Sequence, residues 1–130
     1  MIAVDTSALM AVLLGEKQAD ACAEVLEREA EAVISAGTVA EALIVAARRN
    51  IGDEMRRLID GLGLEVIAVT PAAAHRIAAA YGRWGRGVHP AGLNFGDCFA
   101  YELAKEQSCR LLFVGDDFSK TDLESVLPSA

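Results

Sequence analysis

The feature that most constrains this chain is the alternation of short apolar runs with longer stretches of helical character. Each run is short enough to be one buried strand, and helix-forming residues separate it from the next run. Because parallel strands must be joined by crossovers, this order predicts an α/β fold with a parallel sheet covered by helices on both faces. The four expected strands are Met1–Val4, Ala32–Ser35, Leu64–Val69 and Arg110–Val114.

The helices between these strands are marked by capping residues and by apolar periodicity. A proline at the first helical position strengthens the signal at Thr70-Pro71. The segment 82–92 has four glycines and a proline and is expected to be a loop. The predicted helices are Ala8–Leu14 capped by Asp5-Thr6-Ser7, Lys17–Glu29, Val39–Arg49 opened by Thr38, a short helix from its cap Asp53 to Leu62, Pro71–Tyr81, and Phe95–Gln107 started by Asn94.

Composition places the chain among globular proteins. With 130 residues, 53% of them hydrophobic, residues 1–130 are expected to form a single domain. No apolar run is long enough to span a membrane, and the first residues lack the basic start of a signal peptide, so the cytoplasm is the expected location. The three cysteines show no CxxC spacing, which favours reduced thiols over a disulfide or a zinc site.

The net charge of −7 argues by itself against a protein that binds nucleic acid. The distribution of charge is less restrictive, because no acid occurs between Glu65 and Asp97 and that stretch contains arginines. Arg83, Trp84 and Arg86 in the expected loop could contact RNA through charge and ring stacking. Alternatively the loop is simply solvated and Trp84 packs against the core.

Acidic residues follow the expected strands or open the expected helices. Asp5 ends the first strand, Glu41 lies one turn into the helix after the second, and Asp116-Asp117 follow the fourth. Ligands of open α/β sheets bind beyond the carboxyl ends of the strands, so these acids are candidates for one site. Asp97, in the first turn of a helix that precedes the last strand, joins them only if that helix points its N-terminus to the same edge.

Each acid also has a purely structural explanation. Asp5 could be a helix cap, and Thr38-x-x-Glu41 and Asn94-x-x-Asp97 both have the spacing of a capping box. Asp and Gly are common in turns such as Gly115-Asp116-Asp117. The functional interpretation therefore depends on the acids as a set.

Converged carboxylates repel one another, and a divalent cation relieves that repulsion. Hard oxygen ligands suit Mg²⁺, which can lower the pKa of water and stabilise charge on a phosphoryl group. Zinc fits less well, since only His75 and His89 are available. Metal-free acid–base chemistry by these two histidines is an alternative, although nothing in their spacing brings them together.

Several motifs together resemble those of PIN-domain proteins, specifically VapC-type toxins of bacterial type II toxin–antitoxin pairs. The resemblance covers nearly the whole chain in the expected order. The matching segments are Ile2–Leu9, Thr38–Glu41, His89–Phe99 with its Leu-Asn-Phe-Gly-Asp-Cys-Phe run, Leu111–Phe118 with Gly-Asp-Asp-Phe, and Thr121-Asp122.

The resemblance implies a three-layer α/β/α sandwich with a short parallel sheet, and an endoribonuclease that uses Mg²⁺ or Mn²⁺. It implies Asp5 and Asp97 as direct metal ligands, with Glu41 and Asp117 completing the catalytic pocket. Asp117 is preferred to Asp116 because the last acid of the family stands immediately before a phenylalanine, which is Phe118 here. Supporting roles fall to Asp116, to Thr6 or Ser7 as hydrogen-bond donors, and to Asn94 as the residue that orients Asp97.

The same resemblance implies partners. Such toxins cut tRNA or ribosomal RNA to halt translation, are usually homodimers, and are inhibited by a VapB-type antitoxin that places a basic side chain among the acids. Three other interpretations stay open: a PIN nuclease of RNA processing without a toxic role, a non-catalytic metal- or partner-binding module, and a phosphate-accepting receiver. A receiver would need an acidic pair after the first strand and a lysine soon after the last, which this sequence lacks.

Overall fold

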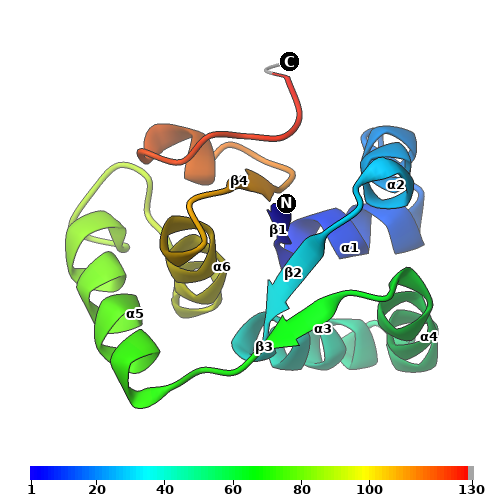
Figure 1. Ribbon diagram of the computed structural model, residues 1–130, viewed down its shortest axis with the longest axis horizontal. Coiled ribbons are helices and arrows are strands. Elements are labelled where there is room, and N and C mark those ends of the chain that lie inside the picture. Colours follow the sequence, from blue (N-terminus) through cyan, green and yellow to red (C-terminus); the bar gives the residue numbers. More distant parts are fainter. Residues whose placement is uncertain (129–130) are drawn as a thin grey trace.

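The computed structural model describes residues 1–128 as alternating strands and helices (Figure 1). The α/β prediction is confirmed: β2 has the predicted bounds, and the other three strands are one to three residues shorter than predicted. The elements are β1 (Ile2–Val4), α1 (Thr6–Leu14), α2 (Ala19–Arg28), β2 (Ala32–Ser35), α3 (Ala36–Arg48), α4 (Gly52–Leu62), β3 (Glu65–Ile67), α5 (Pro71–Trp84), α6 (Phe95–Glu106), β4 (Arg110–Leu112) and the 3₁₀ turn η1 (Phe118–Lys120).

The four strands form one parallel sheet in the order β3-β2-β1-β4. Ile2 of the central strand pairs with Ala32 on one side and with Arg110 on the other. The chain therefore moves outward from β1 through β2 to β3, and then returns to add β4 on the opposite side. The order of the strands reverses between β1 and β4, which is where open α/β sheets bind their ligands.

Successive strand residues point to opposite faces and feed two separate cores. Ala3, Val33 and Leu111 pack with α5 and α6, whereas Ile2 and Ile34 pack with α1 to α4. Figure 1 shows α5 and α6 on the left of the sheet and α1, α2 and α4 on the right. The three-layer arrangement follows from this alternation.

Four helix starts differ from the predictions, including those of α1, which begins at Thr6, and of α2, which begins at Ala19. Ser35 ends β2 and caps α3 itself, with its side chain accepting from the Gly37 N–H at 3.2 Å, so the predicted start at Thr38 is wrong. Helix α4 begins at Gly52 without any side-chain cap, so Asp53 lies in the first turn instead of capping it. An acid in that turn still interacts favourably with the helix dipole.

The predicted glycine-rich loop starts later than expected, because α5 continues to Trp84. Thr70 caps this helix as predicted. The segment after it is held by backbone bonds from the Leu93 N–H to the Trp84 carbonyl and from the Arg86 N–H to the Leu93 carbonyl. Arg83 and Trp84 thus belong to a helix, and only Arg86 lies in the loop.

The three cysteines Cys22, Cys98 and Cys109 are free thiols, as predicted, and the first two are buried. None of the helices within residues 1–128 combines the length and apolar character needed to cross a membrane.

Candidate active site

Asp5 stands at the carboxyl end of β1, beside the point where the strand order reverses. It caps α1, with its Oδ2 accepting from the Ser7 N–H at 3.0 Å and from the Ser7 hydroxyl at 2.7 Å. The residue is only 3% exposed, and its Oδ1 is buried without a hydrogen-bond partner within residues 1–128. One oxygen of this carboxylate thus serves the helix cap, and the other is unpartnered in the described part of the chain.

The pKa of Asp5 is raised to about 7. Burial is the main cause, and the negative charges of Asp97 and Glu41 add to it, while the two hydrogen bonds from Ser7 act in the opposite direction. Asp97 and Glu41 come from α6 and α3, which are far from Asp5 in the sequence. The tertiary structure thus brings at least three acids into one electrostatic neighbourhood.

Glu41 is held by Thr6 and not by a capping box. The Thr6 hydroxyl donates to Glu41 Oε1 at 2.6 Å, which ties α1 to α3 next to Asp5. Thr38 lies inside α3, is fully buried, and has no hydrogen-bond partner for its Oγ1. The capping-box explanation of Glu41 is therefore wrong, because Ser35 already occupies the cap.

Asp97 occupies the first turn of α6, and the N-terminus of this helix faces the acidic edge. Asn94 and Asp97 form a complete capping box, with the Asp97 N–H donating to Asn94 Oδ1 at 2.8 Å and the Asn94 N–H donating to Asp97 Oδ2 at 2.9 Å. The structural explanation of Asp97 is thus correct, but it accounts for only one of the two carboxylate oxygens.

The pKa of Asp97 is raised to about 6 by its surroundings. Burial contributes most, and the charges of Glu41 and Asp117 raise it further, while the Asn94 backbone bond and the Arg86 charge lower it. Asp117 is exposed at the start of η1, and its side chain makes no cap bond. The neighbouring Asp116 instead borders a separate hollow with Gln18 and Ser119.

Gly96 is a site residue that the sequence analysis did not single out. A Cβ at this position would collide with Glu41 Oε2, so the first turn of α6 can approach α3 this closely only because residue 96 has no side chain. Gly37 plays the corresponding part on α3, where a Cβ would meet the ring of Phe99. The Gly-Asp sequence at 96–97 is visible in the chain. It indicates the close approach to Glu41 only when α3 is known to pack against α6.

The donor set fits a hard divalent cation. Within residues 1–128 no three His, Cys, Asp or Glu side chains are grouped closely enough to enclose an ion by themselves. Mg²⁺ does not require such a cage, since it usually takes one or two carboxylates and keeps several waters. The unpartnered oxygen of Asp5, with Asp97 as its charged neighbour, supplies that smaller set.

The other candidate residues are not all at this site. Trp84 is buried, donates from Nε1 to the Tyr101 hydroxyl at 2.9 Å, and so packs against the core instead of offering a ring for RNA. Arg83 lies over the Trp84 ring at 4.5 Å, and only Arg86 acts on the acids.

The two histidines are separated by most of α5. His75 is exposed in the second turn of the helix, and roughly 13 Å of helix follows before Trp84. His89 lies beyond that end, with its ring against Trp84 and its Nδ1 accepting from the Ala91 N–H at 3.0 Å. This placement does not support the two-histidine chemistry.

Comparisons with known proteins agree with this geometry. Residues 2–124 match the family described as PIN domain. The chain is 42% identical over 124 residues to Ribonuclease VapC42 of Mycobacterium tuberculosis, covering 92% of this chain and 95% of the relative. It is 44% identical over 126 residues to Ribonuclease VapC36 of the same species, covering 93% and 90%.

Two solved structures share the fold at low sequence identity. The crystal structure of VapC20 from Mycobacterium tuberculosis, described as a sarcin-ricin loop cleaving toxin, has a TM-score of 0.79 at 17% identity and covers 98% of this chain and 100% of that one. VapBC2 from Rickettsia felis, solved with a DNA fragment from its promoter, has a TM-score of 0.67 at 14% identity and covers 92% of each chain.

Proposed function

Because the chain belongs to the VapC-type family of PIN-domain proteins, we propose that it is a metal-dependent endoribonuclease and the toxin of a type II toxin–antitoxin pair. The relatives that support this are named ribonucleases and are matched over nearly their whole length. The observation that carries the proposal is the convergence of Asp5, Glu41, Asp97 and Asp117, with a buried Asp5 oxygen left unpartnered.

Asp5 and Asp97 would hold Mg²⁺ or Mn²⁺. When bound, such an ion lowers the pKa of water and neutralises charge on a phosphate. Ser7 keeps one oxygen of Asp5 directed to the helix cap, so the other faces the ion site. Asn94 fixes Asp97 in the same way through the capping box. Preorganised carboxylates of this kind need no rearrangement when the substrate arrives.

The remaining residues would position the substrate. Glu41, tied to Thr6, and the exposed Asp117 complete the negative pocket and orient the attacking water by hydrogen bonds. Arg86 offers a positive charge beside Asp97, where it would contact the RNA backbone. Asp116 precedes Asp117 in the sequence and lines the neighbouring hollow with Gln18 and Ser119, so any contribution to catalysis would come from outside the acidic pocket.

The proposed substrate is structured RNA such as tRNA or ribosomal RNA, and its cleavage would halt translation in the cytoplasm. VapC20 is described as cleaving the sarcin-ricin loop, and this RNA is one substrate to test with the present chain. Cleavage without growth arrest would indicate a PIN nuclease of RNA processing instead.

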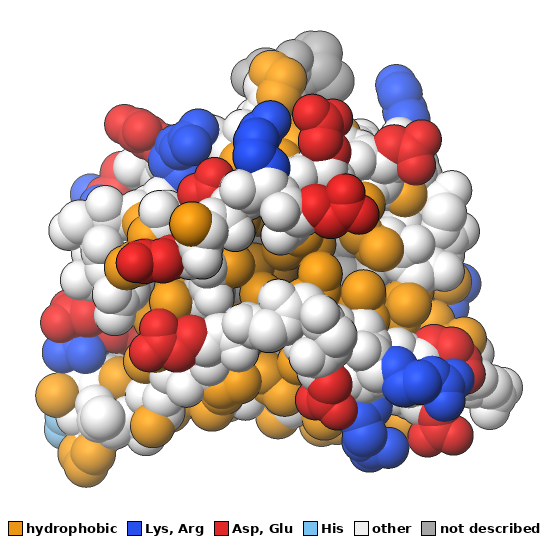
Figure 2. Space-filling view, turned by 45° about the vertical axis from the view of Figure 1, so that its right-hand side comes forward, with side chains coloured by type: hydrophobic (Ala, Val, Ile, Leu, Met, Phe, Trp, Pro, Cys, Tyr) orange, Lys and Arg blue, Asp and Glu red, His pale blue; other side chains and the backbone are white. Residues whose placement is uncertain are grey.

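The proposed partners are a VapB-type antitoxin and a second copy of the chain. An acidic pocket is a natural binding place for an arginine of the antitoxin, since guanidinium and carboxylate bind in a bidentate manner. Figure 2 shows that, on the face it presents, apolar side chains lie in a hollow bordered by acidic and basic ones. An apolar segment with flanking charges could cover such a surface.

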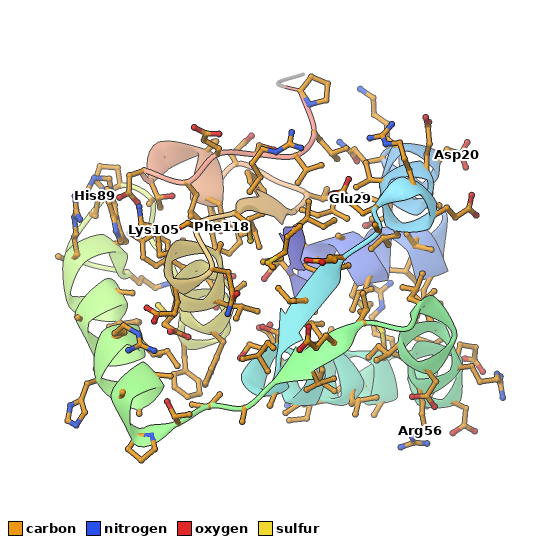
Figure 3. All side chains as sticks on the ribbon, in the orientation of Figure 1. Asp20, Glu29, Arg56, His89, Lys105 and Phe118 are labelled. Atoms are coloured by element: carbon orange, nitrogen blue, oxygen red, sulfur yellow. The ribbon has the colours of Figure 1, made fainter. Side chains whose placement is uncertain are left out.

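The test compares three asparagine substitutions in the purified chain. Asp5→Asn and Asp97→Asn are expected to lower the rate of RNA cleavage by at least roughly 100-fold in Mg²⁺ or Mn²⁺, and to abolish growth arrest on expression. Asp20→Asn makes the same chemical change on exposed α2, far from α6 (Figure 3), and should have no effect. Full cleavage by both site variants, or unchanged cleavage in EDTA, would overturn the proposal.

A further inference from the structure

Within residues 1–128 the Asp117 carboxylate accepts no hydrogen bond, so its position depends on the segment 114–121 that carries it. The upstream end of this segment is fixed where the Val114 N–H donates to the Ser7 hydroxyl at 3.0 Å. In the middle, Phe118 is buried and its ring packs 5.2 Å from that of Phe113.

Asp122 fixes the downstream end by binding to α6. The Tyr101 hydroxyl donates to Asp122 Oδ1 at 2.7 Å, and Lys105 Nζ lies 3.0 Å from Asp122 Oδ2. Thr121 lies between η1 and Asp122, and its hydroxyl donates to the Phe118 carbonyl at 2.7 Å. This hydrogen bond fixes the chain between η1 and Asp122. Figure 3 shows Lys105 and Phe118 in this part of the molecule.

Tyr101 lies on the same stripe of α6 as the site. Residues four apart share a helix face, so Asp97, Tyr101 and Lys105 follow one another along α6. The Tyr101 hydroxyl also accepts from Trp84 Nε1, and Trp84 ends the helix that precedes Arg86. One hydroxyl therefore joins α6, which carries Asp97, to the residue that follows the segment of Asp117 and to the end of α5, two residues before Arg86.

We propose that the Tyr101 hydroxyl, with Asp122, is a positioning group that sets Asp117 relative to Asp97 and so controls divalent-metal binding and cleavage. The group touches neither metal nor RNA and acts through the segment 114–121. This inference rests on the proposed function, because it assumes that the acids bind a metal. The hydroxyl has one proton to give, to Asp122, and one bond to accept, from Trp84, so a phenylalanine cannot replace it.

The first measurement is amide hydrogen exchange without metal. Tyr101→Phe is expected to increase exchange in 114–123, because the downstream tie is lost. The matched control is Glu102→Gln, one residue along α6, which weakens the pair between Arg76 Nε and Glu102 Oε2 at 3.0 Å but leaves Tyr101 in place. Exchange in 114–123 that is unchanged in Tyr101→Phe, or raised equally in the control, would contradict the inference.

The second measurement is a double-mutant cycle on Mn²⁺ affinity, by calorimetry at a temperature where all variants are folded. Tyr101→Phe should weaken Mn²⁺ binding roughly tenfold, as the loss of outer hydrogen bonds does at other metal sites. In an Asp117→Asn background the same change should cost less than about twofold. Asp122→Asn keeps an acceptor for Tyr101 and should retain most of the affinity.

The outcomes separate the two hypotheses. An equal loss of affinity in both backgrounds means that Tyr101 is merely structural, and it overturns the inference alone. A wild-type chain that binds no Mn²⁺ and cuts no RNA overturns the proposed function and the inference together.

Discussion

Asp5 and Glu102 are both buried carboxylates, 3% and 7% exposed, but the chain gives a cation to only one of them. Arg76 Nε lies 3.0 Å from Glu102 Oε2 and pairs α5 with α6. One oxygen of Asp5 accepts hydrogen bonds from Ser7, and the other has no hydrogen-bond partner within residues 1–128. The charges that act on Asp5 are those of the acids Asp97 and Glu41. Burying a charge without a partner is costly, so the two residues must serve different purposes.

A structural acid and a candidate metal ligand differ in this fold in whether the chain supplies a counterion. The negative charge of Glu102 is balanced, because the chain itself supplies Arg76 as its counterion. The charge of Asp5 has no such counterion, and the nearby charges of Glu41 and Asp97 raise its pKa further. A cation from solution would give the acidic edge what Arg76 gives Glu102.

The largest expected effect is on the pH dependence of stability in metal-free protein. The pKa of Asp5 is about 7 in the folded state against 3.8 ordinarily, so between pH 4 and 7 the folded state holds more protons than the unfolded state. Stability must therefore fall as pH rises through this window. Asp5→Asn should remove roughly 2–4 kcal/mol of this fall. Urea unfolding at several pH values in EDTA measures it, and a wild-type chain that gains stability over this range would contradict it.

The next effect is stabilisation by metal. Mn²⁺ at 100 times its dissociation constant should stabilise the wild-type chain by about 2.7 kcal/mol, because it binds only the folded acids. The midpoint of thermal unfolding should then rise by roughly 8–14 °C, at about 3–5 °C for each kcal/mol in a domain of this size. Asp5→Asn should lose most of the shift, and Asp20→Asn should keep it. An equal shift in all three would mean that the ion binds elsewhere.

A smaller effect on stability is expected from removing the counterion of Glu102, which then resembles Asp5 in being buried without a cation. Arg76→Ala leaves Glu102 without its main counterion, which should cost about 1–2 kcal/mol of unfolding free energy, less than a fully buried pair because Arg76 is 42% exposed. Mn²⁺ affinity should not change. If Arg76→Ala created a second Mn²⁺ site at Glu102 and Glu106, the distinction drawn between the two carboxylates would be sharpened.

The smallest effect is expected at Gly96. Gly96→Ala places a methyl group against Glu41, which must move away from Thr6, so we expect cleavage to fall roughly tenfold, equivalent to about 1.4 kcal/mol. Gly82→Ala is the matched control in α5, where a Cβ meets nothing within 4 Å and should raise stability slightly. Unchanged cleavage in Gly96→Ala would show that the contact with Glu41 is not needed.

Part of the site could be predicted from local sequence. Asp5 directly follows an apolar strand, and Asn94 stands three residues before Asp97, so both caps were expected and both are present. Thr70-Pro71 likewise started α5. These signals act between residues two or three positions apart, which is why they can be read without knowing the fold.

Other features depended on competition between neighbouring signals. Ser35 and Thr38 could each have capped α3, and the chain uses Ser35 because β2 ends there. Trp84 was expected either to contact RNA or to pack against the core, and in the structure it is buried and its N–H donates to the Tyr101 hydroxyl. In both cases the local pattern allowed two arrangements, and the packing of the folded chain selected one.

The α/β pattern, the acids at strand and helix ends, and the family could be recognised from the order of the residues. That Asp97 of α6 lies near Asp5, that Glu41 is held by Thr6 and that Glu102 is paired with Arg76 became evident only in the folded chain. These contacts join residues that are far apart along the chain. Capping and periodicity are set by adjacent residues, whereas the meeting of charges separated by tens of residues depends on strand order and on which helices pack together.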